Sequence, residues 1–157
     1  MPRADTYGCH DEQMARTRTD ELLLGEWACL GVIAPRPTHG FAVAAALKPS
    51  GEVGRVWSMS RPLTYRAIDH LTERHLIEPI GEEPGLAGGN RTILAATADG
   101  RSRLYDWLSM PVEHLRDLRS QFLLKLVLAD LNGRRTATLL RQQHQIVERL
   151  TDALTPA

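Results

Sequence analysis

Two short strand-like runs interrupt an otherwise helical pattern, and this interruption most narrowly limits how the chain can fold. The runs cover residues 76–80 and 91–96, and the segment between them, residues 81–90, is rich in glycine. Strand-like runs joined by a glycine-containing connection predict a β-hairpin. Because helical patterns lie on both sides of it, the sequence predicts a mainly α fold with a small two-stranded β wing.

Two helical segments are predicted before the hairpin, near the start of the chain. Residues 21–33 carry apolar side chains at helical spacing, and Pro35 then predicts the end of that helix. A shorter helix is expected over residues 38–48, with Thr38 as its N-cap and Phe41 on its apolar side.

A third helix is predicted over residues 58–76, directly before the hairpin. Ser60 is its expected N-cap, and Pro62 falls in the first turn, where its missing N–H does no harm. The apolar stripe predicts the buried face: Leu63, Ile68, Leu71 and Leu76, with Tyr65 near its edge. The residues expected to face outward, wholly or partly, are Arg61, Thr64, Arg66, Asp69 and Arg74.

Helical patterns continue after the hairpin. Thr97 is the expected N-cap of a helix over residues 98–109, and Pro111 marks a break. Two further helices are predicted, over residues 112–131 and 135–154. The last one has a stripe that recurs every seven residues, at Leu140, Val147 and Leu154.

The order of these segments predicts three parts in the chain. Residues 1–19 are polar and aperiodic, which is typical of a flexible tail. Residues 20–109 have the helix-helix-helix-hairpin order of a winged helix-turn-helix domain, and residues 110–157 form a C-terminal helical region. Since a single amphipathic helix cannot bury its own stripe, this last region is expected to dimerise.

The charge of the chain is balanced. The 19 basic and 19 acidic residues cancel, whereas domains that bind nucleic acid are usually basic. Residues 55–74, which cover most of the predicted third helix, hold four basic and two acidic residues and are weakly positive. The balance therefore counts against DNA binding unless charge is segregated along the chain.

Other classes of protein are excluded by the absence of their signals. The polar start of the chain contains no signal peptide, and no apolar run is long enough to span a bilayer, so a cytoplasmic location without membrane contact is expected. Cys9 and Cys29 lie in unlike settings and are expected to be unpaired. No histidine or cysteine spacing indicates a metal site, and no phosphate-binding or nucleophile motif indicates an enzyme, so neither a cofactor nor catalysis is expected.

Several short motifs follow one another along the chain: Leu30-Gly31, Thr38-His39-Gly40-Phe41, Ser60 to Ile68, Leu71, Leu76-Ile77-Glu78, Arg91 and Thr97 to Gly100. Their order and spacing resemble the PadR family of transcriptional regulators. The similarity covers about residues 22–154 and implies a winged helix-turn-helix, a C-terminal dimerisation region and repression of nearby genes that a small molecule or another signal relieves. One departure is Thr64, where the family often has leucine.

The third helix is the predicted DNA-reading element, because the major groove admits a helix whose N-terminal residues reach the base edges. Arg61 and Arg66 are expected to contact guanine or phosphate, and the Tyr65 hydroxyl is expected to contact phosphate, although a solvated charged face and a core-edge tyrosine explain the same residues. The full predicted DNA-binding set is His39, Ser60, Arg61, Thr64, Tyr65, Arg66, Asn90 and Arg91.

Self-association is predicted for the helical region, and any effector is expected to bind in the cavity between the two halves of the dimer. A dimer of this kind would match a palindromic, double-stranded operator. The expected dimer interface is Leu115, Leu118, Phe122, Leu140, Ile146, Val147, Leu150 and Leu154. The residues proposed to line an effector pocket, for which a plain core role is the alternative, are Trp27, Trp107, Phe122 and Leu126.

A second function stays open. A winged-helix scaffold that has lost DNA binding and acts as a protein-interaction adaptor would also fit the sequence. The zero net charge is its best support. Salt-dependent binding to DNA separates the two hypotheses.

Overall fold

The computed structural model describes residues 21–155, so the predicted tail over residues 1–19 and Cys9 lie outside the described residues. The helices, in chain order, are α2 (Leu24–Ile33), α3 (Gly40–Leu47), α4 (Arg61–Glu73), α5 (Ala98–Ser109), α6 (Leu123–Leu131) and α7 (Ala137–Leu154). One short 3₁₀ turn, η1 (Leu115–Asp117), and one π turn, η2 (Leu118–Phe122), precede α6. The strands are β1 (Thr38–His39), β2 (Ile77–Pro84) and β3 (Asn90–Ala96).

The sheet has three strands in the order β1-β3-β2, where the sequence predicted two. Thr38 pairs with Leu94 and His39 with Ile93, so these two residues form a strand rather than the start of the second helix. The predicted N-cap at Thr38 is therefore wrong. His39 caps α3 instead, because its Nδ1 accepts a hydrogen bond from the Ala42 N–H at 3.1 Å.

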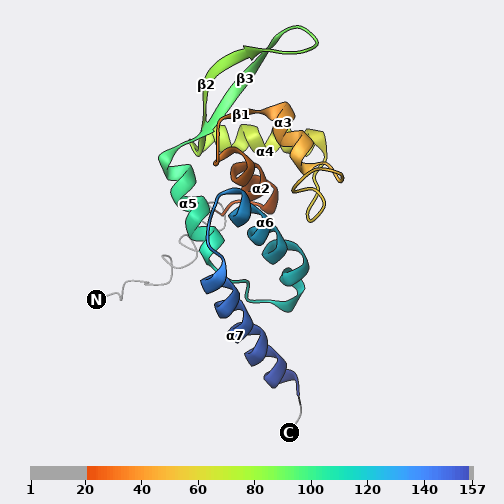
Figure 1. Ribbon diagram of the computed structural model, residues 1–157, viewed down its shortest axis with the longest axis vertical. Helices are drawn as coiled ribbons and strands as arrows, with labels where there is room; N and C mark the ends of the chain where they lie inside the picture. Colours follow the sequence, from red (N-terminus) through yellow and green to blue (C-terminus); the bar gives the residue numbers. More distant parts are fainter. Residues whose placement is uncertain (1–20, 156–157) are drawn as a thin grey trace, which may run out of the picture.

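The hairpin of β2 and β3 is longer than predicted and projects from the helical body (Figure 1). Its ladder extends to the pair Pro84–Asn90, which leaves residues 85–89 as the connection. Gly88 and Gly89 have φ angles of +85° and +79°, a left-handed conformation that costs glycine little. The glycines thus allow the tight reversal that the sequence predicted.

The predicted caps of α4 and α5 are confirmed. Ser60 Oγ accepts from the Leu63 N–H, although the distance is long at 3.5 Å. Thr97 Oγ1 accepts from the Gly100 N–H at 3.0 Å. α4 is shorter than predicted at both ends, and His75, with a φ of +56°, follows its last turn.

Three side chains face the opposite way from their predicted orientation. Thr64 is fully buried, and its Oγ1 donates to the Ser60 carbonyl at 3.0 Å. Leu63, predicted in the buried stripe, is 49% exposed, and Phe41 is 47% exposed. The third helix is therefore rotated relative to the predicted stripe, with Thr64, Ala67, Ile68 and Leu71 facing the core.

The main core joins the winged-helix elements to α6. Leu124, Leu128 and Ala129 of α6 pack in the same buried cluster as residues of α2, α4 and α5. Asn132, just after α6, also donates from Nδ2 to the Gly31 carbonyl of α2 at 2.9 Å. The packing therefore continues across the predicted division between residues 109 and 110.

α2 is tied to α4 by polar contacts as well as by packing. The buried Glu26 places Oε1 2.7 Å from His70 Nδ1, and its Oε2 accepts from the Leu23 N–H at 2.9 Å. Cys29 is free and buried, which confirms the prediction for this cysteine, and its thiol lies 3.9 Å from the Thr64 carbonyl. Burial, and secondarily Glu26, raise the pKa of Cys29 to about 12, so the thiol is protonated at neutral pH.

The segment between α5 and α7 is not the single helix predicted over residues 112–131. It begins with η1 and η2 and becomes α-helical only at Leu123. A second, smaller cluster of Val112, Phe122 and Leu139 holds this segment against the start of α7. Gln143 strengthens the contact, since its amide bonds both the N–H and the carbonyl of Val112. Beyond it, α7 extends away from the body (Figure 1).

Lys125 is a buried cation that holds α6 to the end of α5. Its Nζ donates to the carbonyls of Trp107 at 2.8 Å and Met110 at 2.6 Å, and lies 4.5 Å from the Trp107 ring centroid. Burial lowers the pKa of Lys125 from 10.5 to about 8. The carbonyls and the ring partly compensate the lost hydration of the charge.

The lowered pKa predicts a pH dependence of stability. Above pH 8 the folded chain loses this proton before the unfolded chain does, so the free energy of unfolding should rise with pH up to about pH 10. We expect a Lys125→Met variant to lose about 1–2 kcal/mol of this rise, measured by urea unfolding at pH 7.5 and pH 10. The exposed Lys48 provides the control, because Lys48→Met should leave the rise intact.

Candidate nucleic-acid interface

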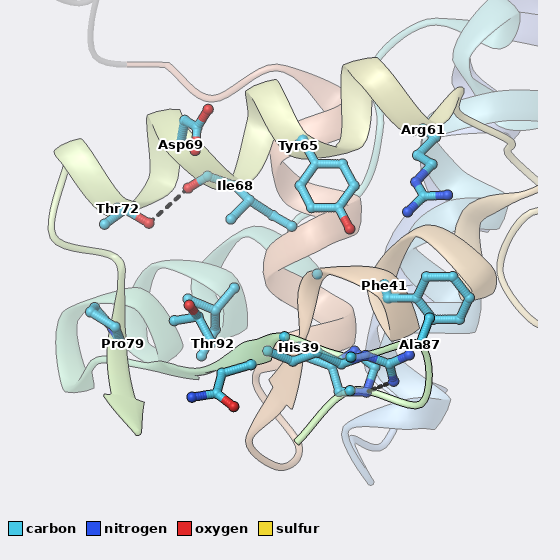
Figure 2. A pocket seen from close by; sticks show the side chains of 17 residues that line it. His39, Phe41, Arg61, Tyr65, Ile68, Asp69, Thr72, Pro79, Ala87 and Thr92 are labelled. Atoms are coloured by element: carbon cyan, nitrogen blue, oxygen red, sulfur yellow. Dashed lines mark hydrogen bonds between the residues drawn. The ribbon is translucent and has the colours of Figure 1, made fainter. Parts of the chain in front are cut away.

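The predicted DNA-binding residues meet at a cavity between α3, α4 and the hairpin. The cavity has a volume of about 630 Å³. Figure 2 shows Arg61 and Tyr65 projecting from α4 toward Phe41, with His39 and Ala87 on the side of the hairpin. The predicted residues that line it are His39, Arg61, Tyr65, Asn90 and Arg91.

The three other predicted residues lie outside this lining. Ser60 caps α4 next to the cavity, and Arg66 is exposed on the same helix. Thr64 is fully buried beneath α4, so its predicted outward position is wrong and its side chain does not reach the surface. The cause is local, because its hydroxyl bonds back to the preceding turn of the helix.

Phe41 organises the charged side chains of the cavity. The guanidinium carbon of Arg61 lies 5.4 Å from the centroid of its ring, and that of Arg91 lies 4.9 Å away. Arg61 also lies 5.8 Å from the Tyr65 ring centroid. Cation–π contacts of this kind hold the two guanidinium groups in place while leaving their N–H donors free for other partners.

His39 connects α3 to the hairpin. Its Nδ1 accepts from the Ala42 N–H, so in the neutral ring the proton is on Nε2. Nε2 lies 3.3 Å from Glu83 Oε1 and 3.4 Å from Arg91 Nη1. Because Nε2–H and the guanidinium are both donors, the hydrogen bond goes to Glu83.

The sequence did not single out Phe41 or Glu83 as functional residues. The sequence predicts Phe41 only as an apolar side chain of its helix, within a His-Gly-Phe motif. Glu83 lies in the segment expected to be a connection, and only the longer ladder pairs it with Arg91. Asn90 also has an unpredicted partner, since its Nδ2 donates to Glu82 Oε2 at 3.1 Å.

The residues proposed for an effector pocket fall into two clusters. Trp27 and Trp107 stack in the main core, with ring centroids 4.8 Å apart and planes 7° from parallel. Phe122 and Leu126 belong to the smaller cluster beside α7. The structure therefore does not bring the four side chains together.

A second hollow is lined by part of the predicted dimer interface. It is an apolar groove of about 610 Å³ between η2 and α7. Leu140 and Leu154 on α7 are 46% and 72% exposed, and Leu115 is also exposed. Of the predicted interface, the residues that line the groove are Leu118, Phe122, Leu140 and Val147.

Between residues 21 and 155, no helix combines the length and apolar character that crossing a membrane requires. Over the same residues, no three histidine, cysteine or acidic side chains come together as metal ligands would.

Three helices followed by an antiparallel hairpin define a winged helix, and comparison with known structures agrees. The chain resembles Bacillus subtilis PadR, solved in complex with operator DNA, with a TM-score of 0.52 and 20% sequence identity. The match covers 67% of this chain and 58% of that one, so it spans less than two thirds of PadR. At this identity the likeness shows a shared winged-helix fold.

The other comparisons add less. The PcaV transcriptional regulator from Streptomyces coelicolor, solved with its natural ligand, matches over 99% of this chain and all of that one, with a TM-score of 0.38 and 15% identity. No family model matches the sequence, and no curated protein matches it.

Proposed function

We propose that the chain is a sequence-specific, DNA-binding transcriptional regulator and not an enzyme. The observation that carries the proposal is the surface made by the first turns of α4 and the hairpin, where Arg61, Tyr65 and Arg91 converge. PadR, with which the chain shares its fold, was solved on operator DNA. By this analogy α4 enters the major groove and the hairpin lies against the adjacent backbone.

The chemistry of α4 fits this role. Arg61 is the first residue of the helix and is exposed, so its guanidinium can reach a guanine edge with two parallel hydrogen bonds. Tyr65 lies one turn later and is 38% exposed, and we expect its hydroxyl to contact a phosphate rather than a base.

We further propose that the protein acts as a homodimer on a palindromic operator. The support is the apolar groove between η2 and α7, on whose wall Leu140 is 46% exposed. A second copy of α7 would cover it, and a two-fold dimer places two α4 helices on two half-sites. Repression relieved by a small molecule or another signal is proposed on the resemblance to PadR regulators.

The alternative is a winged-helix adaptor that binds protein. The hairpin favours it, because β2 and β3 carry Glu78, Glu82 and Glu83 against the single cation Arg91. A titration of a fluorescent duplex at 50 and 200 mM salt separates the two functions. Regulation requires binding that weakens steeply with salt, whereas no binding at low salt would favour the adaptor.

Two substitutions on α4 test the direct reading of DNA. Arg61→Ala should weaken operator binding by about 1–3 kcal/mol and relax the preference at one position per half-site. Tyr65→Phe should cost about 0.5–1.5 kcal/mol, nearly equally on operator and scrambled DNA, because it removes one phosphate contact. Both are measured at one fixed salt concentration. If both folded variants bind the operator like the wild type, α4 is not the reading element.

A further inference from the structure

Two acidic side chains lie at or beside the surface proposed to contact DNA: Asp69 lines the cavity, and Glu83 stands next to it on the hairpin, opposite Arg91. Glu83 is at the outer part of β2, directly opposite Arg91 on β3, and its side chain is 46% exposed. A carboxylate in this place is unexpected in a wing, because it repels the phosphates that the neighbouring arginines attract.

Glu83 is held in this position by a defined contact. The cap at the start of α3 uses Nδ1 of His39 as an acceptor, so Nε2–H of the neutral ring points its proton at Glu83 Oε1. The imidazole therefore bridges the helix and the hairpin. The same ring nitrogen lies 3.4 Å from Arg91 Nη1, so His39 brings the carboxylate and this cation to one point.

The two cations near Glu83 are positioned by one ring. Phe41 holds the guanidinium groups of Arg61, from α4, and Arg91, from β3, each within 5.4 Å of its centroid. Two elements distant in sequence thus present their charges to the same stretch of surface. A DNA backbone has phosphates spaced closely enough to meet both.

We propose that Glu83 is a built-in competitor for the DNA backbone at this arginine pair. In the free protein its carboxylate partly neutralises Arg91, and bound phosphates must overcome that attraction. The inference rests on the proposed DNA binding. Because phosphates are the same in every sequence, the competition lowers affinity for all DNA and leaves base reading at α4 to decide where the protein stays.

The test is Glu83→Gln, with Glu82→Gln as the matched control. Glu82 is the neighbour on the same strand, is exposed, and lies on the alternate face, bonded to Asn90. Glu83→Gln should tighten binding to operator and to scrambled duplex by about two- to fivefold. It should also steepen the slope of log affinity against log salt by up to about one, since Arg91 becomes free to contact phosphate. Glu82→Gln should change both quantities much less.

A double-mutant cycle shows whether the effect passes through the arginine. In an Arg91→Gln background, Glu83→Gln should give little further gain. Equal effects of Glu83→Gln and Glu82→Gln would mean only a change of overall charge and would overturn the proposal. Weaker binding by Glu83→Gln would also overturn it, because Glu83 would then be needed to position the hairpin.

The outcomes separate this inference from the function on which it rests. If the wild-type protein fails to bind duplex DNA at low salt, the regulator proposal fails. If the wild type binds and the Glu83 variant matches its control, only the competitor proposal fails. Thermal unfolding of each variant verifies that the fold is unchanged.

Discussion

A Val147→Asp variant is expected to sediment as a monomer and to lose about a hundredfold or more in operator affinity. Val147 lines the groove between η2 and α7, so a buried carboxylate there would lack a partner when two copies meet. In a dimer, binding of one subunit to its half-site holds the other subunit close to the second half-site, which raises the affinity for the whole operator. A monomer lacks this gain. Analytical ultracentrifugation and DNA titration measure the two effects on one sample.

The control for this variant lies on the other side of the same helix. Gln145→Asp adds the same charge at an exposed position that is outside the groove lining. It should leave the sedimentation and the affinity nearly unchanged. A Val147→Asp protein that stays dimeric while folded would place the interface elsewhere.

A Leu128→Ala variant is expected to lower the free energy of unfolding by about 2–5 kcal/mol. Leu128 is fully buried in the main core, and its methyl groups pack against Gly31 of α2. Leu128 lies beyond the predicted winged-helix domain, over residues 20–109. The loss of stability should nevertheless appear in the unfolding of the whole winged helix. Urea unfolding followed by both fluorescence and circular dichroism measures it.

Leu123→Ala is the comparison on the same helix. Leu123 is 41% exposed, so its truncation should cost well under the Leu128 value. If Leu128→Ala unfolds α6 in a separate transition, at a lower urea concentration than the rest of the chain, then α6 is not part of the shared core.

Local chemistry made part of the fold predictable. The caps at Ser60 and Thr97 depend on side chains three residues from their partners, and the sequence located both correctly. β1 was missed because a two-residue strand has no pattern of its own, and its pairing partner, β3, lies far along the chain. Thr64 was misplaced because its hydroxyl is satisfied within the helix, which allows a polar residue to be buried.

The candidate site was likewise predictable only where it depends on local sequence. Arg61, Tyr65 and Arg91 were identified from their positions in the predicted helix and hairpin, and they line one cavity. The contacts that position the charged groups of the cavity join His39 to Glu83 and Phe41 to Arg91. In each pair the two residues are more than forty positions apart. Nothing within a local window of sequence indicates such contacts, and only the paired strands bring them together.

α2 lies between α4, the proposed DNA-reading helix, and α6, which leads to the proposed dimerisation helix α7. One of its sides packs on α4 and carries Glu26 against His70, and another packs on α6, where Asn132 bonds the Gly31 carbonyl. In a dimer joined through α7, a tilt of α6 and α7 relative to the partner would therefore move α4 by the same rotation, as part of one rigid body. The distance between the two α4 helices of the dimer must match one turn of B-DNA. The crossing angle of the two α7 helices would set that distance.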